Sequence, residues 1–318
     1  MTYSKNFKRA VVLGAGGFIG LNLVTYLVEQ GFDVTCFDRI DNPNWPSHVH
    51  RIVGEFSDPA PQLIQAMDGA MVFHLVSSCR PSNSTTAAAR EVVDDVAATI
   101  RYLEASKNLN TRWIFVSSGG TVYGQPILSV PIKESSPTEP ICSYGVVKLT
   151  IERYLALYKK LHATDYVIAR VANPYGPWQD PHKGQGVIAA LVFKATARQP
   201  VEIWGDGENI RDYLYITDLT QSLLKLAQLG VSGDIYNIGS QIGLSINQLV
   251  ITISETLDLP IQINRIPARN SDVRYNVLDA EKISSLTKSS AAVGLREGIL
   301  LTAQWQQSRL IVLSNDIG

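Results

Sequence analysis

Cysteine is scarce in this sequence, and its placement excludes two common kinds of site. The chain has 318 residues but only three cysteines, Cys36, Cys79 and Cys142, which lie far apart and form no C-x-x-C pair. Structural zinc sites and disulfide frameworks need closely spaced or more numerous cysteines. The spacing therefore argues against both, and unpaired thiols favour a reducing compartment, so we expect a cytoplasmic protein.

An excess of charge of either sign is also lacking. The formal net charge is −1, and no basic stripe runs along the chain. Proteins that bind nucleic acid or anionic membranes usually carry such a stripe, so neither partner is expected. An anionic ligand must instead be held by a local site.

Two features could suggest other classes, but their surroundings argue against it. Val11–Val28 carries no charge, yet it contains several glycines, and no signal-peptide cleavage site follows it. We interpret it as a buried strand followed by a packed helix, and we expect no membrane insertion. His48 and His50 have strand spacing, but no third ligand is nearby, so we predict no metal site.

Short apolar runs alternate with longer helical patterns through the first two thirds of the chain. Continuous apolar runs indicate strands covered on both faces, and strand–helix–strand repetition predicts a doubly wound parallel α/β sheet. The predicted strands are Ala10–Leu13, Asp33–Phe37, Ala70–Val76, Arg112–Val116, Tyr166–Val171 and Ile235–Ile238. The predicted helices are Phe18–Gln30, Ala87–Lys107 and Tyr144–His162.

After Arg170 the pattern loosens into loops and short elements. We expect residues 1–172 to form a dinucleotide-binding unit, joined by later strands from about residues 211–240. Residues 173–210 and 241–318 are expected to form a smaller lobe that binds the substrate.

The first strand–helix unit has the pattern of a Rossmann-type dinucleotide site. Gly14, Gly17 and Gly20 follow a strand, open a helix and give the spacing G-x-x-G-x-x-G. Glycine allows close approach of the backbone to a pyrophosphate at a helix N-terminus. The next strand ends at Asp38, whose carboxylate can accept ribose hydroxyls and would repel a 2′-phosphate, so NAD is favoured over NADP. The adjacent Arg39 could soften that preference.

A second constellation suggests acid–base chemistry. Tyr144 and Lys148 stand four residues apart, hence on one face of a predicted helix. A lysine charge beside a phenol favours the phenolate, which makes the tyrosine usable as a base near neutral pH. A strand ending in Ser117-Ser118-Gly119-Gly120-Thr121 precedes this helix and offers hydroxyl groups.

Further motifs accompany these two along the chain. They are VFHLVSS (72–78), FVSSGGTVYG (115–124), RVANPYGP (170–177), WGDGENIRDYLYITD (204–218), YNIGS (236–240), PARNSDVRYNVLDAEKI (267–283) and a late helix around Trp305. Together with GAGGFIG (14–20) and Tyr144-x-x-x-Lys148, they make the chain resemble the extended short-chain dehydrogenase/reductase superfamily. Within it, the chain is similar to the UDP-galactose 4-epimerase group of nucleotide-sugar epimerases.

The resemblance implies roles for particular residues. Tyr144 would be the acid/base at the sugar 4-hydroxyl, and Lys148 would hold the nicotinamide ribose and tune Tyr144. NAD would be bound by Gly14, Gly17, Phe18, Ile19, Gly20, Asp38, Arg39, Glu55, Phe56, Leu75 and Lys148. The nucleotide-sugar would be contacted by Ser118, Tyr144, Asn173, Arg211, Arg269, Asp272 and Asn276. The resemblance also implies a homodimer that pairs the two long helices. An alternative for Arg211 is a surface ion pair with Asp212 or Asp218.

The sequence departs from the family pattern at the expected catalytic hydroxyl. Aligned on VYG, that hydroxyl falls on Gly119, which has no side chain. Ser118 is our first choice to replace it, followed by Thr121 and then Ser117. The alternative is that Ser118 only caps the strand end and Thr121 packs nearby.

Two other departures bear on the site. Asp95 stands where the family usually has asparagine, and Asn276 stands where a bulky tyrosine favours plain hexoses in some epimerases. A smaller residue there would leave room for a 2-acetamido group, so UDP-N-acetylhexosamines are expected beside UDP-glucose and UDP-galactose.

Several related functions remain as alternatives. A 4,6-dehydratase of the family would need an Asp-Glu pair at the positions of Gly120 and Thr121, and a decarboxylase would need a glutamate there. The sequence has neither carboxylate, which argues against both reactions. Asp38 opposes an NADP-dependent sugar reductase. A non-catalytic NAD-binding regulator stays open because of Gly119. The resemblance, together with the missing Asp-Glu pair, implies an NAD-dependent 4-epimerase that acts on a UDP-hexose through a transient 4-keto intermediate.

Overall fold

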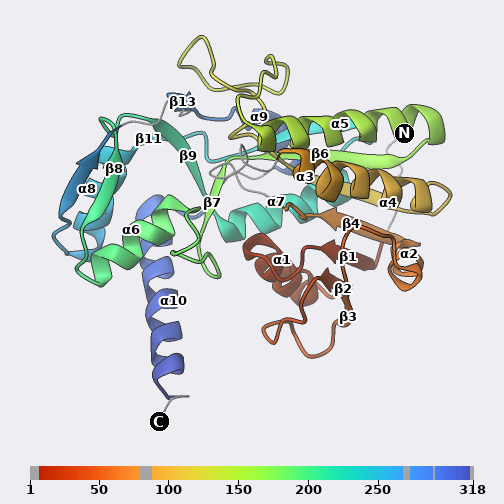
Figure 1. Cartoon of the computed structure of the whole chain (residues 1–318), viewed down its shortest axis with the longest axis horizontal. Helices are drawn as coiled ribbons and strands as arrows, with labels where there is room; N and C mark the ends of the chain where they lie inside the picture. Colours follow the sequence, from red (N-terminus) through yellow and green to blue (C-terminus); the bar gives the residue numbers. More distant parts are fainter. Residues whose placement is uncertain (1–6, 79–87, 268–272, 289–290, 316–318) are drawn as a thin grey trace.

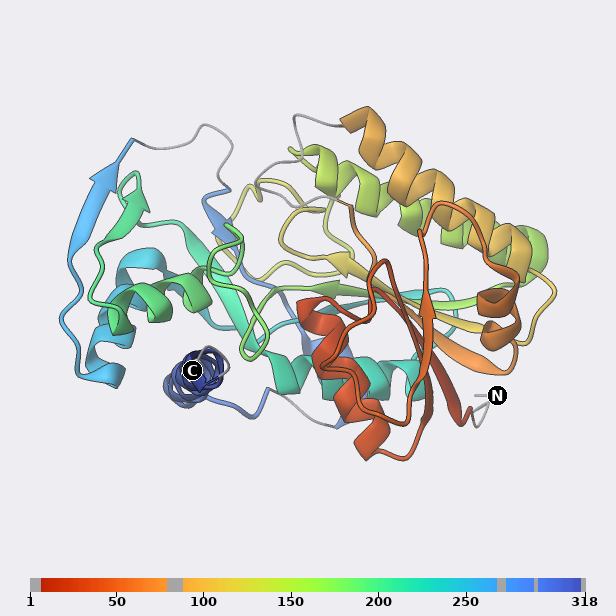
Figure 2. The same ribbon diagram turned by 60° about the horizontal axis from the view of Figure 1, so that its bottom comes forward.

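The computed structural model describes residues 7–78, 88–267, 273–288 and 291–315, and the side chains as far as Arg309. Figures 1 and 2 show a larger part built around one sheet and a smaller part that holds the last helix, α10. Cys79, Arg269 and Asp272 lie outside the described residues.

A parallel sheet of seven strands forms the centre of the larger part, in the order β10-β6-β5-β4-β1-β2-β3. This confirms the predicted doubly wound α/β fold. The strands are β1 (Arg9–Leu13), β2 (Asp33–Asp38), β3 (His50–Val53), β4 (Ala70–His74), β5 (Arg112–Ser118), β6 (Asp165–Val171) and β10 (Asp234–Ile238). Only β3 was not predicted: it is an edge strand without a fully buried residue, so it lacks a continuous apolar run.

Helices cover both faces of this sheet. The helices α1 (Phe18–Glu29) and α7 (Ile216–Leu229) contact each other on one face, as Figure 2 shows. The other face carries α2 (Pro61–Met67), α4 (Ala98–Ser106) and α5 (Ser143–His162). Each face has its own cluster of buried apolar side chains, so the strands are covered on both sides.

The predicted helix at 87–107 is interrupted in the structure. It consists of α3 (Ala88–Glu91), a π-helical turn η1 (Val92–Ala97) and α4. Such π-turns are rare overall, but those that occur often lie at functional sites. The turn contains Asp95, which is buried.

The smaller part is built from short strands and helices. The strand β9 (Ile210–Tyr215) pairs with β11 (Gly243–Ser245), β13 (Tyr275–Asn276) and β7 (Asn173–Tyr175). A separate pair joins β8 (Val201–Trp204) to β12 (Ile263–Ile266). The helices are α6 (Val187–Thr196), α8 (Ile246–Leu257), α9 (Glu281–Thr287) and α10 (Leu295–Asn315). The division of the chain at residue 172 remains a prediction.

The uncharged stretch at 11–28 is divided between β1, a glycine turn and α1, and α1 packs on the sheet. Within the described ranges, no helix combines the length and the apolar character needed to cross a membrane.

Candidate functional site

Most of the predicted site residues gather at the carboxyl ends of the parallel strands. Gly14 follows β1, Asp38 ends β2, Leu75 follows β4 and Ser118 ends β5. Because neighbouring strands run in the same direction, these ends meet at one edge of the sheet. Ligands of doubly wound sheets bind outside this edge.

The structure gives a different reason for glycine at each of the three positions of the fingerprint. Gly14 has a φ of +85°, a left-handed conformation that favours glycine. A Cβ on Gly20 would lie 2.2 Å from the carbonyl oxygen of Gly14, so only glycine lets α1 pack against the turn. A Cβ on Gly17 would meet only that same oxygen, at 3.4 Å. Gly17 is the N-cap of α1 and no side chain caps the helix, which leaves an open cradle of the kind that binds phosphate.

Asp38 faces this turn. Its Oδ2 accepts a hydrogen bond from the Gly16 amide at 2.8 Å, and its Oδ1 accepts one from the Arg39 amide at 2.7 Å. The Asp38 side chain is partly buried, whereas Arg39 is exposed. A carboxylate fixed beside a glycine-rich helix start is the arrangement that a dinucleotide with a free ribose 2′-hydroxyl requires. The turn and this acid therefore fit NAD.

The apolar residues predicted to contact the cofactor are distributed unevenly. Phe18 and Ile19 are partly buried at the start of α1, and the backbone of Leu75 packs against Gly14. The Phe56 ring instead belongs to the core, where it stacks on Tyr102 with ring centroids 4.6 Å apart. Any contact of this segment with a cofactor would therefore come from the Phe56 backbone or from Glu55.

Glu55 is exposed, in contrast to the buried ring beside it. Its carboxylate is therefore accessible to a ligand.

Tyr144 and Lys148 lie in the first turns of α5, on one face of the helix. The Lys148 ammonium is 5.6 Å from the centre of the Tyr144 ring and donates a hydrogen bond to the Val116 carbonyl at 3.2 Å. Lys148 is only 2% exposed, so its charge is poorly screened by water. This geometry can stabilise a phenolate at Tyr144.

The Lys148 charge also acts on neighbouring groups. Burial and then Lys148 hold the pKa of the His74 ring well below its usual value, so this histidine is neutral. Its Nε2 lies 2.9 Å from the Thr99 hydroxyl. Burial raises the pKa of Asp95, although Lys148 and hydrogen bonds from Ser78 and Ser77 oppose the shift. Asp95 accepts the Ser78 amide at 2.8 Å, so it fixes the chain directly after β4.

The structure separates the candidate hydroxyls. Ser117 donates to Glu152 at 2.6 Å on the buried side of β5 and is engaged away from the predicted site. Ser118 is partly buried and shares a space with Asn173, since a Cβ on Gly120 would lie 3.8 Å from the Ser118 Oγ and 3.9 Å from the Asn173 Oδ1. The Thr121 Oγ1 is buried and has no hydrogen-bond partner among the described residues.

A side chain at position 119 would point in a different direction from the Ser118 side chain. A Cβ at this position would lie 2.5 Å from the Leu278 Cδ1 and 3.3 Å from the Arg170 carbonyl oxygen. A serine on this backbone would therefore direct its side chain into the packing around Leu278 rather than toward Ser118 and Asn173.

Three of the predicted substrate residues, Asn173, Arg211 and Asn276, lie on the small sheet. Asn173 in β7 donates to the Asp212 carbonyl in β9 at 2.9 Å. Asn276 in β13 is the register partner of Arg211 in β9. Asp212 and Asp218, the alternative partners of Arg211, are buried and accept backbone amides of other segments.

Sequence reasoning missed a buried ion pair behind the site. Glu152, two turns after Tyr144 in α5, pairs with Arg170 in β6 at 2.6 Å, and both side chains are 3% exposed. Arg170 also lies over the Tyr123 ring, 4.8 Å from its centre. Removing one partner of such a pair costs about 3–5 kcal/mol, because the other charge stays buried. The signal in the sequence is only the spacing Tyr144–Lys148–Glu152, which places all three on one helix face.

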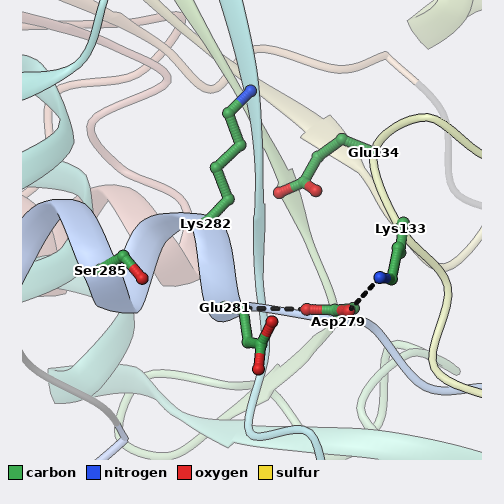
Figure 3. A pocket seen from close by; sticks show the side chains of 6 residues that line it. All are labelled: Lys133, Glu134, Asp279, Glu281, Lys282 and Ser285. Carbon is green, nitrogen blue, oxygen red and sulfur yellow. Dashed lines mark hydrogen bonds and ion pairs between the residues drawn. The ribbon is translucent and has the colours of Figure 1, made fainter.

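A charged pocket of about 300 Å³ lies next to this ion pair, since the carbonyl of its lining residue Glu134 accepts a hydrogen bond from Arg170 at 3.4 Å. It is lined by Lys133, Glu134, Asp279, Glu281, Lys282 and Ser285, none of which belongs to the predicted site. Figure 3 shows Lys133 directed at Asp279, 3.9 Å away. No group of three or more potential metal-ligating side chains occurs in the part of the chain that the structure describes.

Comparisons with known proteins agree with this geometry. The model of the NAD dependent epimerase/dehydratase family matches residues 10–239. The chain is 30% identical over 303 residues to a putative UDP-glucose 4-epimerase of Methanocaldococcus jannaschii, covering 94% of this chain and 98% of the relative.

Two solved structures are similar over almost the whole chain. A UDP-glucose 4-epimerase of Thermotoga maritima with UDP-glucose has a TM-score of 0.89 and 29% identity, covering 95% of this chain and 99% of that chain. A UDP-N-acetylglucosamine 4-epimerase of Methanobrevibacter ruminantium in complex with UDP-N-acetylmuramic acid has a TM-score of 0.88 and 26% identity, with the same coverage.

Proposed function

Because the chain belongs to the NAD-dependent epimerase/dehydratase family, we propose that it inverts carbon 4 of a UDP-hexose through a transient 4-keto sugar. UDP-glucose and UDP-galactose are the first candidates, and the UDP-N-acetylhexosamines are the second. The observation that carries the proposal is the placement of Tyr144, Lys148 and Ser118 at one edge of the sheet. The segment 117–124 beside them contains no carboxylate.

Tyr144, Lys148 and Ser118 have separate roles in the proposed acid–base step. Tyr144 accepts the proton of the sugar 4-hydroxyl and later returns it, while Lys148 stabilises the phenolate in between. Ser118 donates a hydrogen bond to the same oxygen and keeps it in line with Tyr144. NAD, when bound, supplies the acceptor and donor of the hydride at carbon 4. It would be held by the glycine turn, Asp38 and Lys148.

The nucleotide part needs cationic and amide donors. Arg211 and Asn173 lie on neighbouring strands of the small sheet, and Asn173 borders the space that Ser118 faces. A guanidinium can bridge two diphosphate oxygens and stays charged when buried. Arg269 and Asp272 complete the proposed nucleotide site.

The absence of a carboxylate at Gly120 and Thr121 distinguishes epimerisation from related reactions. A dehydratase must move protons at carbons 5 and 6 as well, and it needs an additional acid and base for this step. In the described chain, the space beside Gly120 holds a hydroxyl and an amide, which can bind a substrate oxygen but are poor bases.

Exposed apolar side chains support a homodimer. Val92 and Val93 in η1 are 50% and 55% exposed, and Leu157 and Leu161 in α5 are 43% and 61% exposed. The segment η1–α4 packs along α5, so these residues can form one surface (Figure 1). We place the dimer in the cytoplasm, where Cys36 and Cys142 stay unpaired. Light scattering of Leu161→Glu, expected to give monomers, tests the dimer.

The proposed reaction is tested with a panel of sugars. Purified protein is incubated with UDP-galactose, UDP-N-acetylgalactosamine and UDP-glucuronate, and the products are followed by NMR. We expect inversion at carbon 4 with carbons 5 and 6 intact. A 6-deoxy-4-keto product would instead identify a dehydratase, and a pentose would identify a decarboxylase.

A further inference from the structure

The Gly119 backbone is fixed from two sides at the carboxyl end of β5. Its amide donates to the Val171 carbonyl at 2.9 Å, and its carbonyl accepts a hydrogen bond from the Asn276 Nδ2 at 3.0 Å. Val171 ends β6 of the main sheet, whereas Asn276 lies in β13 of the small sheet. Gly119 is therefore a point where the two sheets are joined.

Asn276 is fully buried, which is unusual for an asparagine that serves only to pack. Its Oδ1 has no hydrogen-bond partner within the described part of the chain. A buried polar atom without a partner is unfavourable, so an apolar residue of similar size would fit this position better unless the Nδ2 bond has a purpose. Among the described residues, the bond to Gly119 is the one hydrogen bond that asparagine makes here and leucine could not.

The segment needs such a restraint because it contains two consecutive glycines. Gly119 and Gly120 lack side chains and have wide backbone freedom. The Val171 bond orients the peptide before Gly119, and the Asn276 bond orients the peptide after it. Ser118 directly precedes this pair, so the direction of its hydroxyl depends on how both peptides are held.

We propose that Asn276 is a positioning residue that fixes the Gly119 carbonyl and thereby the Ser118 hydroxyl, and that it does not measure the size of the sugar. The inference rests on the proposed function, in which Ser118 binds the 4-hydroxyl oxygen. It replaces the expectation that Asn276 makes room for an acetamido group. A fully buried amide bonded to a backbone carbonyl is poorly placed to contact that group.

The two roles of Asn276 predict different kinetics. In the positioning role, Asn276→Leu keeps the branched side chain of four heavy atoms, with bulkier ends, but removes the donor, so kcat falls about tenfold, the equivalent of one buried hydrogen bond. KM and the ratio of rates with UDP-galactose and UDP-N-acetylgalactosamine stay unchanged. In a size-selecting role, that ratio would change and kcat for one sugar would be preserved.

A double-mutant cycle with Ser118→Ala separates positioning from loss of stability. If Asn276 acts through Ser118, Asn276→Leu has little further effect on kcat once the hydroxyl is gone. The matched control is Asn237→Leu, because Asn237 is also fully buried and donates its amide to the Ile132 carbonyl at 2.8 Å. The control is expected to lower stability and to add independently to Ser118→Ala. Independent addition for Asn276→Leu would overturn the proposal, as would a shift in sugar preference.

A structural arm keeps the inference separate from the proposed function. If the wild type inverts no UDP-sugar, the proposed function fails, and crystal structures of wild type and variant decide the inference alone. We expect the Gly119 carbonyl to turn and the Ser118 Oγ to move in Asn276→Leu. An unchanged segment 117–121 would overturn the inference. Asn276→Ala, which also lacks the donor, replaces the leucine variant if that variant does not fold.

Discussion

Restoring a hydroxyl at Gly119 should damage the protein rather than improve it. The family pattern suggests Gly119→Ser as a gain of function. In the structure, however, the new Cβ would lie 2.5 Å from the Leu278 Cδ1 and 3.0 Å from its Cδ2. Leu278 is fully buried among Val122, Ile132 and other apolar residues, so it has little room to move.

The size of the effect follows from two opposing terms. Overpacking of a core costs about 1–3 kcal/mol, and replacing glycine offsets about 0.4–1 kcal/mol by restricting the unfolded chain. The free energy of unfolding should thus fall by about 1.3 kcal/mol at the midpoints of the two ranges and by about 2.6 kcal/mol at most, which lowers the Tm by about 2–4 °C. Differential scanning calorimetry measures the Tm, and the epimerisation rate is expected to fall with it.

Shortening Leu278 provides the rescue. Leu278→Ala alone leaves a cavity that costs about 2–5 kcal/mol, but it frees the volume that the Gly119→Ser side chain needs. The double variant should therefore be more stable than the sum of the two single changes predicts. If Gly119→Ser were as stable as the wild type and more active, the backbone orientation described for Gly119 would be wrong.

Two further predictions concern the cofactor site and pH. Asp38→Asn removes the carboxylate, so it should weaken NAD binding by roughly tenfold to a hundredfold and strengthen NADP binding. Titration calorimetry measures both affinities, and an unchanged preference for NAD over NADP would contradict the role of Asp38. His74 has a folded-state pKa well below 6.5, so the unfolded chain takes up a proton that the folded chain does not. The contribution of His74 to the free energy of unfolding should thus be complete above about pH 6.5, and it should fall by about 1.4 kcal/mol per pH unit below that pH. His74→Gln should flatten this slope in urea unfolding, and an equally steep slope in the variant would exclude His74 as its source.

Much of the fold could be predicted because buried parallel strands leave a clear pattern. The strand β6 is buried from its second residue onward, and its apolar run Tyr166–Ala169 stands out in the sequence despite the buried Arg170 that follows. The strand β3 has no such run, because an edge strand is covered less. The break of the helix at Asp95 was equally hidden, since a π-turn inserts a residue without changing the apolar composition.

The candidate site was predictable where chemistry follows from local spacing. Tyr144 and Lys148 share a helix face by their separation alone, and the glycine turn is fixed by its neighbours. The contacts that a side chain at position 119 would make could not be predicted, since they involve Leu278, which is distant in the sequence. For the same reason the Asn276 bond to Gly119 could not be predicted, and the role of Asn276 in sugar selection stays a prediction that the kinetics of Asn276→Leu test.

Buried charges were the hardest to predict. Glu152 and Arg170 look like ordinary solvent-exposed charges in the sequence, yet they pair with 3% exposure behind β5. Tertiary packing alone decides whether a charged residue on a helix faces water or the core. The structure thus adds to the motifs a rigid support for the segment that carries Ser118.

Exchange of UDP-galactose with UDP-glucose by the wild type and by Tyr144→Phe tests the central claim most directly. Both proteins are loaded with NAD, the bound NAD is quantified, and inversion at carbon 4 is followed by NMR. We predict equal NAD content in the two proteins and a rate in Tyr144→Phe lower by at least about a hundredfold, because the acid–base group is lost. Unchanged turnover in Tyr144→Phe, or no inversion by the wild type with NAD bound, would contradict the account.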